Sequence, residues 1–360
     1  MNKQVENVSA ALQDEKQKFY DINSDDFFNY VTEPIIITDS FGLIEYLNNY
    51  SASFSVKLSL NVNIFEIFPN FNECDLLNDN GIIKENNQFE TTFKEDGFTK
   101  KYLLVKIIKL KKKKFLFFLT DITQKKMVEK VHKDFVSNVS HELRSPLTSL
   151  IGFLEVLRSE KEIPHDMRNR FLSIMDEESK RMNRLVDDLL TLSRVEVEEN
   201  NQNFVSISII PLIQQVIDSL KIKCVQKNIR IKQVTQITDN FINRRVMGIS
   251  DEIVTVFVNL IENAIKYGFE DTDINIKFSE PKINLLKIEI SNSGEFISER
   301  HLSRLTERFY RIDKARSRAV GGTGLGLAIV KHILLRHKSE FDISSTIKGV
   351  NTFSVIFKTI

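Results

Sequence analysis

A histidine beside a glutamate is the first feature of this sequence that could do chemistry. His141 and Glu142 lie in FVSNVSHELRSPLTSL, residues 135 to 150, whose apolar spacing predicts a helix. An imidazole is a nucleophile near neutral pH, and a neighbouring carboxylate can orient it and accept its proton as a phosphoryl group arrives. Pro146 removes a backbone hydrogen bond one turn later and can bend the helix. A surface histidine with an incidental proline explains these residues equally well.

Two asparagines one helical turn apart offer a second kind of chemistry. In NLIENAIKYG, residues 259 to 268, one helical face carries the polar residues Asn259, Asn263, Lys266 and Tyr267. Amide oxygens can bind Mg²⁺, and a lysine on the same face can neutralise phosphate oxygens. The apolar residues Ile253, Phe257, Leu260, Ile261 and Ala264 are predicted to line the other face. A solvated polar face is the alternative for this segment taken alone.

Glycines ahead of an apolar helix form the third motif. GGTGLGLAIVKHI, residues 321 to 333, contains Gly322, Gly324 and Gly326, so unpaired backbone N–H groups could point at phosphate oxygens. The cluster lacks the lysine of a Walker loop and the spacing of a dinucleotide site. The preceding basic stretch RIDKARSRAV, residues 311 to 320, has no apolar period and is typical of a lid over a nucleotide.

The N-terminal third of the chain is predicted to consist of short helices and strands. Residues 1 to 22 predict a polar helix, and residues 23 to 121 predict a small mixed α/β module. Its strands are expected in PIIITDSFGLIEYLN, FEIFPNFNE, KYLLVKIIKL and FLFFLTDI. The run KKKK at residues 111 to 114 predicts a solvated hairpin turn, with a role at a membrane surface as the alternative.

Residues 122 to 200 predict a helix hairpin with a break at EKEIPHD, residues 160 to 166. A heptad pattern with one stutter runs along the first arm and places His141 on the outer face. The apolar stripes are Val136, Val139, Leu143, Leu147, Leu150, Leu154 and Leu157 on the first arm, and Met182, Leu185, Leu189 and Leu192 on the second. Such a hairpin buries little alone, so two copies are expected to pair as a dimeric four-helix bundle.

Residues 201 to 360 predict an α/β sandwich, one sheet covered by helices. Strands are expected in FVSISI, IRIKQV, DINIKFS, LLKIEIS, FDISS and FSVIFK. Helices are expected in IPLIQQVIDSLKIKCV, DEIVTVFVNLIENAIKYG and the segment that starts TGLGLAIVKHILLRH. The three motifs therefore fall on one hairpin and one sandwich.

Composition narrows the class of protein. At 360 residues the chain is too long for one core, and its formal charge of +1, with both signs interspersed, argues against a nucleic-acid partner. Cys74 and Cys224 are far apart without metal-ligand spacing, as expected in a reduced cytoplasmic protein. No apolar run approaches the ~20 residues of a spanning helix, so no transmembrane segment is predicted. A cytoplasmic location follows as an expectation, with peripheral membrane association left open.

Taken together and in order, the motifs resemble those of the sensor histidine kinases of two-component systems. SHELRSPLT is similar to the phosphoacceptor box, NLIENAIKYG to the asparagine box, ERFYRID to the phenylalanine box and GGTGLGLAIVKHI to the second glycine box. The N-terminal module resembles a PAS sensor domain. The runs FLSIMDEESKRMNRLVDDLLTLSRVE and RLTERFYRIDKARSRAVGGTGLGLAIVKHILLRH are most similar to the phosphate-regulon sensor kinases of alphaproteobacteria.

The resemblance implies a fold and an activity. It implies an α+β PAS-like domain, a dimeric helical hairpin and an ATP-binding α/β sandwich of the gyrase, chaperone and histidine kinase superfamily. The implied reaction is autophosphorylation of His141 by ATP in a homodimer, followed by transfer to a response regulator aspartate, in phosphate-starvation signalling for the narrower branch. Glu142, Ser145 and Arg311 are the other implied catalytic residues. Ser145 keeps a hydroxyl where the family commonly positions water for dephosphorylation.

The resemblance also implies a nucleotide site in the sandwich. Asn259 and Asn263 would hold Mg²⁺, with Lys266 and Tyr267 near the phosphates and ribose. The other residues implied to bind ATP are Asn292, Gly294, Phe309, Gly322, Gly324, Leu325 and Gly326.

One stretch departs from the family pattern. NSGEF, residues 292 to 296, has Asn292 where the family has an adenine-binding Asp, and Phe296 where it has a second glycine. Loss of the charge weakens an acceptor, and a glycine is wanted where φ is positive or a ligand comes close. The alternative function is therefore a noncatalytic scaffold or net phosphatase. An ATPase of the gyrase type is disfavoured, because Asn259 stands where those enzymes have a water-activating Glu.

Overall fold

The computed structural model divides into two compact units, residues 1–134 and 135–360. It describes residues 28–55, 57–69, 71, 88–94, 100–159, 163–197, 204–234, 244–313 and 321–360. The predicted helix at residues 1–22 and residues 314–320 of the predicted lid lie outside the described residues.

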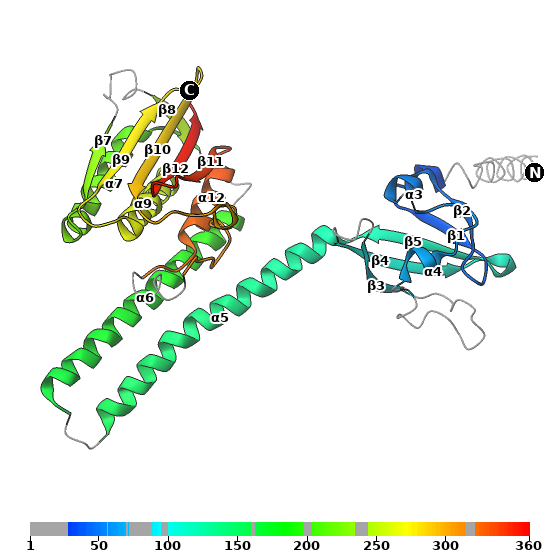
Figure 1. Cartoon of the computed structure of the whole chain (residues 1–360), viewed down its shortest axis with the longest axis horizontal. Helices are drawn as coiled ribbons and strands as arrows, with labels where there is room; N and C mark the ends of the chain where they lie inside the picture. The colour runs from blue at the N-terminus through cyan, green and yellow to red at the C-terminus, as the bar shows by residue number, and fades with distance from the viewer. Residues whose placement is uncertain are drawn as a thin grey trace, which may run out of the picture. The chain divides into compact units, whose positions relative to one another are not determined.

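The first unit is built on a five-stranded antiparallel sheet in the order β2-β1-β5-β4-β3. The strands are β1 Ile35–Thr38, β2 Ile44–Leu47, β3 Gln88–Lys94, β4 Lys100–Lys109 and β5 Phe115–Asp121 (Figure 1). Helices α3, Asn49–Phe54, and α4, Ile64–Ile67, follow β2. The small α/β module predicted for this part of the chain is therefore present.

Aromatic rings fill the core of this unit. Phe71 stacks on Phe68 at 4.8 Å and on Phe117 at 6.3 Å between ring centroids, which ties the chain after α4 to the central strand β5. Buried Asn48 links the sheet to α3, because its side-chain oxygen accepts hydrogen bonds from the backbone N–H of Ile35 and Ser51, each at 3.0 Å. A buried amide that bonds in this way adds specificity without an unsatisfied polar group.

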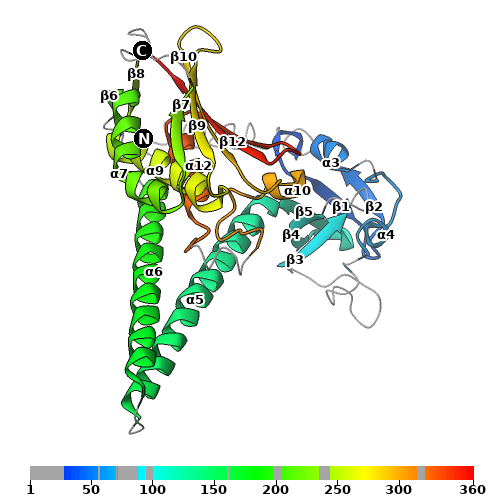
Figure 2. The ribbon, with the colours of Figure 1, turned by 60° about the vertical axis from the view of Figure 1, so that its left-hand side comes forward.

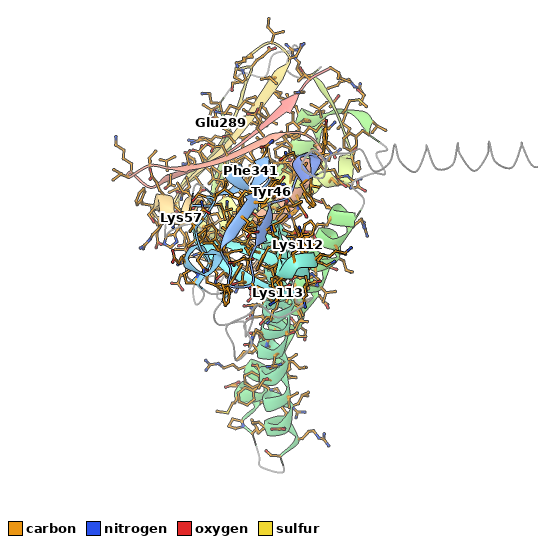
Figure 3. The ribbon with its side chains drawn as sticks, turned by 90° about the vertical axis from the view of Figure 1, so that its right-hand side faces the viewer. Tyr46, Lys57, Lys112, Lys113, Glu289 and Phe341 are labelled. Carbon is orange, nitrogen blue, oxygen red and sulfur yellow. The ribbon has the colours of Figure 1, made fainter. Side chains whose placement is uncertain are left out.

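In this unit one expected strand is a helix, one strand was missed, and the expected lysine turn is confirmed. FEIFPNFNE was expected as a strand, but Ile64–Ile67 is helix α4, capped by Asn63, whose side chain accepts from Phe65 N at 3.0 Å. Strand β3 was not predicted, because polar residues outnumber apolar ones in its sequence, QFETTFK, and hide the apolar alternation of a strand. The lysine run does form the turn between β4 and β5, and Lys112 and Lys113, labelled in Figure 3, adopt positive φ of 61° and 56°.

The boundary between the two units falls within the first arm of a long helix hairpin. Helix α5, Thr123–Arg158, and helix α6, His165–Val197, are separated at the predicted break and run antiparallel (Figure 2). Pro146 lies inside α5 without ending it, so the helix is continuous where the sequence indicated a possible bend. The stripe residues Leu185 and Leu192 are buried, whereas Leu147 and Leu154 on α5 remain 49% and 46% exposed in the single chain. The exposed part of the seam is available to a second hairpin.

An α/β sandwich follows the hairpin. Its main sheet has the order β11-β12-β10-β9-β7, in which only β7 and β9 pair in parallel, and a smaller sheet pairs β6 with β8. The strands are β6 Val205–Ser208, β7 Arg230–Gln233, β8 Arg245–Gly248, β9 Asp273–Ser279, β10 Leu285–Ser293, β11 Glu340–Ser345 and β12 Val350–Lys358. The predicted strands are confirmed, and β8, only RVMG, was missed.

Helices α7, Ile209–Gln226, α9, Ser250–Tyr267, and α12, Gly326–Arg336, cover one face of the main sheet, and α10 is the short turn Glu299–Leu302 (Figure 1). The predicted apolar face of α9 is buried, so its polar face carrying the asparagines points away from the core. Lys227 stabilises the end of α9, because its ammonium donates to the carbonyls of Ile265 and Lys266 at 3.0 and 2.8 Å. Among the described helices, none combines the length and apolar character that crossing a membrane requires.

A buried histidine joins the end of α12 to the start of α9. His337 Nδ1 donates to the carbonyl of Ile333 at 2.8 Å, and its Nε2 accepts from the backbone N–H of Ile249, at the start of α9, at 3.1 Å. Only the neutral ring can make both bonds. Burial lowers the pKa of His337, and the charge of Arg336 lowers it further, although Glu252 lies 3.6 Å from Nδ1.

This arrangement predicts acid sensitivity of the sandwich. Because the pKa of His337 is lower in the folded than in the unfolded chain, the unfolded chain binds more protons, and stability falls as pH drops below about 6.5. Thermal unfolding between about pH 7.5 and about pH 5.5 measures this fall. His337→Asn is expected to lower the melting temperature at the upper pH and to flatten the pH dependence. The exposed His132, changed to Gln, is the control; an equally steep profile in His337→Asn would contradict the assignment.

Candidate functional site

The asparagine motif and the second glycine motif meet at the first turn of α12. Gly326 begins this helix, and a Cβ added to it would lie 2.5 Å from Asn259 Oδ1. Asn259 Nδ2 donates to the carbonyl of Thr255 on its own helix at 2.9 Å, which leaves the amide oxygen directed at the glycines. Asn263, one turn later on the same face, is half-buried. Two predicted binding motifs are thus contiguous.

The phenylalanine motif adjoins the same glycines. Gly324 has φ of +77°, and a Cβ there would lie 3.0 Å from the backbone of Phe309 and 3.2 Å from Arg311 Nε. Phe309 N donates to the Gly324 carbonyl at 2.8 Å. Leu325 is fully buried, and its N–H donates to Thr323 Oγ1 at 3.3 Å. Only a glycine fits at position 324, because both the φ angle and the close contact exclude a side chain.

The NSGEF stretch, residues 292–296, lies against the end of the asparagine motif. Gly294 forms a bridge with Gly268, and a Cβ added to Gly294 would lie 2.8 Å from the carbonyl oxygen of Tyr267. Asn292 is buried at the end of β10, and its Nδ2 donates to the Ser293 carbonyl at 3.3 Å. Phe296 is 51% exposed and does not have a positive φ, so the backbone needs no glycine there on conformational grounds.

Lys266 is held on its own helix rather than extended. Its ammonium donates to Glu262 Oε2 at 3.0 Å, and Lys223 binds the other oxygen of the same carboxylate. Burial acts to raise the pKa of Glu262, but the hydrogen bond from Lys223 and the charge of Lys266 outweigh it and lower the pKa. Tyr267 is 36% exposed beside it. A phosphate would have to compete with Glu262 for Lys266.

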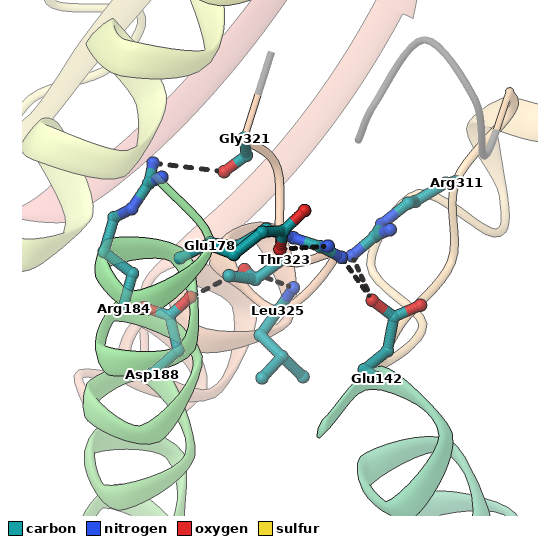
Figure 4. Close-up of polar contacts among 9 residues, drawn as sticks. Glu142, Glu178, Arg184, Asp188, Arg311, Gly321, Thr323 and Leu325 are labelled. Atoms are coloured by element: carbon teal, nitrogen blue, oxygen red, sulfur yellow. Dashed lines mark hydrogen bonds and ion pairs between the residues drawn. The ribbon is translucent and has the colours of Figure 1, made fainter. Parts of the chain in front are cut away.

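The hairpin brings its own groups to these motifs. His141 and Ser145 are exposed on α5, as the heptad pattern predicted for the histidine. Glu142 Oε2 accepts from Arg181 Nη2 on α6 at 2.8 Å and from Arg311 Nη2 at 3.3 Å (Figure 4). The residue next to the predicted phosphoacceptor therefore contacts the arginine of the phenylalanine motif.

The Arg311 guanidinium retains unused capacity to bind an anion. Its side chain is only 4% exposed, and Nε and Nη1 have no hydrogen-bond partner among the described residues. Burial lowers the pKa of Arg311, while the negative charge of Glu142 raises it. A small cavity next to the guanidinium is lined by Glu142, Pro146, Arg181, Met182, Leu185, Arg311 and Thr323. Buried donors without acceptors are costly, so this site favours an anion.

Further contacts join α6 to the glycine-rich loop, residues 321–326. Thr323 Oγ1 donates to Asp188 Oδ2 at 2.6 Å, and Arg184 Nη1 donates to the carbonyl of Gly321 at 3.2 Å (Figure 4). None of the sequence motifs includes Arg181, Arg184 or Asp188. Their spacing along the border of the predicted α6 stripe was the available signal, but it does not identify their partners. Gly322, in the same loop, is half-buried.

A second set of contacts lies at the base of the hairpin. The rings of Phe135 and Phe309 lie 5.8 Å apart between centroids, and the Arg308 guanidinium is 5.3 Å above Phe135. Arg308 also forms an ion pair with Glu196 near the end of α6, and His332 Nε2 lies 3.4 Å from the same carboxylate oxygen. Apolar and charged contacts thus both hold the sandwich against the hairpin.

Asp188 provides a test of the contact between the loop and the hairpin. Burial raises the pKa of Asp188, although the hydrogen bond from Thr323 and the charge of Lys266 oppose this. The Thr323 bond favours the charged carboxylate, but burial favours the protonated one and is the larger effect, so the docked loop is most stable at low pH and loses stability as pH rises through the raised pKa. Asp188→Asn keeps an acceptor oxygen without a charge to desolvate, so we expect the contact to persist and to lose this pH dependence. Asp188→Ala removes the acceptor and should release the loop.

Hydrogen exchange of the amides in residues 321–327 measures this release at neutral pH. Exchange should be faster in Asp188→Ala and no faster in Asp188→Asn than in the unchanged protein. The neighbouring Asp187, which is exposed, changed to Ala is the matched control. Unaltered protection in Asp188→Ala would mean that the Thr323 bond does not hold the loop.

Comparison with known proteins agrees with this geometry. Residues 131–198 match the family model of the His Kinase A (phospho-acceptor) domain, and residues 248–359 match that of the histidine kinase-, DNA gyrase B-, and HSP90-like ATPases. The phosphate regulon sensor protein PhoR of Pseudomonas aeruginosa is 35% identical over 242 residues, 67% of this chain and 53% of that protein. The sensor protein kinase WalK of Staphylococcus aureus is 31% identical over 361 residues, 94% of this chain and 80% of that protein.

A solved structure gives the same fold. The histidine kinase ThkA, crystallised in complex with the response regulator protein TrrA, matches with a TM-score of 0.50 and 19% identity over 93% of this chain and 97% of that chain. The chain spans about half the length of the PhoR relative. Both matched regions carry the motifs that meet around Arg311 and Glu142, and the WalK match extends over nearly the whole sequence. The chain belongs to the two-component sensor histidine kinases.

Proposed function

We propose that this chain transfers the γ-phosphoryl group of ATP to His141 and then passes it to an aspartate of a response regulator. One observation carries the proposal: Arg311, buried and with two unpartnered nitrogens, contacts Glu142, which directly follows His141. Phosphoryl transfer needs mainly positioning and neutralisation of charge. A guanidinium at this place can stabilise the transferred group beside its acceptor.

Phosphorylation of His141 is a single displacement at the γ-phosphorus of ATP. One ring nitrogen of His141 attacks the γ-phosphorus, and the bond from that phosphorus to the oxygen bridging the β-phosphate breaks, so ADP leaves with the electron pair. The proton on the other ring nitrogen passes to Glu142 as the ring gains positive charge. Arg311 would stabilise the negative charge on the phosphoryl oxygens through the donors that face the cavity.

The residues around the glycine-rich loop fit a nucleotide. Gly324 and Gly326 let the loop pack closely against Phe309 and against the amide oxygen of Asn259, so the three motifs lie together where a nucleotide would bind. Asn259 and Asn263 would hold Mg²⁺, which would neutralise phosphate charge when bound. We assign the phosphates and ribose to Lys266 and Tyr267, and the rest of the nucleotide to Asn292, Gly294, Phe309, Gly322, Gly324, Leu325 and Gly326.

The proposal also gives a role to each of the other parts of the chain. The antiparallel sheet of residues 23–121, with α3 and α4 after β2, supports a PAS sensor domain. Residues 122–200 would form the dimerisation and phosphotransfer domain, since Leu147 and Leu154 leave an apolar seam exposed for a second copy. Residues 201–360 would bind ATP. Ser145, exposed one turn after His141, would position water for dephosphorylation.

A noncatalytic scaffold or net phosphatase is the weaker alternative. It rested on NSGEF, but Phe296 has no positive φ, and only the loss of charge at Asn292 remains as an argument. Phosphate-starvation signalling stays a prediction, because relatives named PhoR and WalK match at similar identity.

Replacement of the acceptor tests the reaction. His141→Ala should abolish the acid-labile phosphate formed from labelled ATP and Mg²⁺, because no nucleophile remains, while ATP binding measured by calorimetry stays unchanged. His132→Ala, which removes another exposed histidine of α5, should label normally. Label retained on His141→Ala would exclude His141 as the acceptor, and no label on the unchanged protein would reject the proposed activity.

A negative charge restored at position 292 tests the adenine site. Asn292→Asp should bind ATP about fivefold more tightly, because a charged acceptor strengthens a hydrogen bond by about 1 kcal/mol. Asn284→Asp, an exposed position in the turn between β9 and β10, adds the same charge elsewhere and should leave affinity unchanged. Equal affinity in Asn292→Asp and the unchanged protein would mean that adenine is bound by other groups.

A further inference from the structure

Arg181 is a buried cation that no motif identified. It lies on α6 with its side chain 11% exposed, and its Nη2 donates to Glu142 Oε2 at 2.8 Å across the hairpin. Its Nη1 reaches Glu178 Oε2 at 3.4 Å on the same helix. The bond to Glu142 is the shorter one, so the guanidinium is directed at the carboxylate that follows His141.

The surroundings make this ion pair strong. Pro146, Met182 and Leu185 line the same small cavity as the two charged groups. Apolar walls lower the local dielectric, which strengthens a paired charge and penalises an unpaired one. Removal of Arg181 would therefore cost Glu142 the shorter of its two hydrogen bonds to arginine.

Arg181 and Arg311 are not equivalent partners of Glu142. Arg311 reaches the carboxylate from the sandwich at 3.3 Å, and a phosphate, with more negative charge than one carboxylate, competes for it. Arg181 belongs to the hairpin itself, whose arms α5 and α6 also meet through the rings of Phe153 and Phe171, 5.1 Å apart between centroids. Arg181 is thus the partner that can hold Glu142 throughout the reaction.

We infer that Arg181 is a positioning residue for phosphotransfer: it holds the Glu142 carboxylate where it can take the proton of His141. This rests on the proposed function. Because Arg181 acts through Glu142 and binds no part of ATP, its loss lowers the rate of autophosphorylation and leaves the KM for ATP unchanged.

A double-mutant cycle separates this role from a general structural one. The proteins are the unchanged chain, Arg181→Gln, Glu142→Gln and the double variant, with Arg181→Lys as the conservative change and Glu178→Gln as the matched control. The rate of acid-labile phosphate formation should fall about tenfold or more in Arg181→Gln, with unchanged KM. It should be partly restored in Arg181→Lys and normal in Glu178→Gln.

The decisive comparison is made in the Glu142→Gln background. If Arg181 works through Glu142, the double variant reacts as slowly as Glu142→Gln alone. An equal further loss from Arg181→Gln in that background would overturn the inference, as would a change confined to KM. Melting temperatures and hydrogen exchange of α6 show whether Arg181→Gln folds. If it does not, the rates of Arg181→Lys and Glu178→Gln decide whether Arg181 positions Glu142. A lack of label on the unchanged chain would reject the proposed activity instead, so the two failures are distinguishable.

Discussion

The site depends on one carboxylate oxygen that is shared by two guanidiniums. Glu142 Oε2 accepts from Arg181 on the hairpin and from Arg311 on the sandwich, and all three side chains are largely removed from water. A buried charge of this kind persists only when it is paired, and here one carboxylate lies between two cations. The unpartnered Nε and Nη1 of Arg311 make the cavity between hairpin and sandwich a place that attracts an anion.

The rest of the sandwich keeps Arg311 at that place. Phe309 bonds to Gly324 through backbone atoms, and Gly326 lies against Asn259, so the phenylalanine, glycine and asparagine motifs form one contiguous backbone and side-chain cluster. Helix α9 supports this cluster because its apolar face is buried against the sheet. The glycines matter at 324 and 326 for a steric reason, since a Cβ at either would displace a functional group.

Local sequence patterns predicted most of the helices and strands. Contacts between residues far apart in the sequence determined the features that those patterns missed. The heptad spacing around His141 predicted its exposure, and the spacing in NLIENAIKYG predicted which face of α9 is buried, because both depend on periodicity alone. FEIFPNFNE was misassigned because a single helical turn is too short for periodicity to distinguish it from a strand. Arg181 and Glu142 lie 39 residues apart, and Asp188 and Thr323 lie 135 apart, so no local pattern could pair them.

The contacts of the glycine-rich loop also bear on how nucleotide and hairpin influence each other. Thr323 Oγ1 donates to Asp188 and accepts from the N–H of Leu325, while the carbonyl of Gly321 accepts from Arg184. A phosphate that draws on the N–H groups of this loop would compete with the Leu325 bond to Thr323, and the buried charge of Asp188 already opposes the contact at neutral pH. Linkage makes any such influence mutual: if nucleotide binding loosens the loop from α6, the α6 contacts weaken nucleotide binding by the same factor. The two arginines that contact Glu142 also respond differently to a nucleotide. Arg311 can be drawn to phosphate, whereas Arg181 remains on the hairpin.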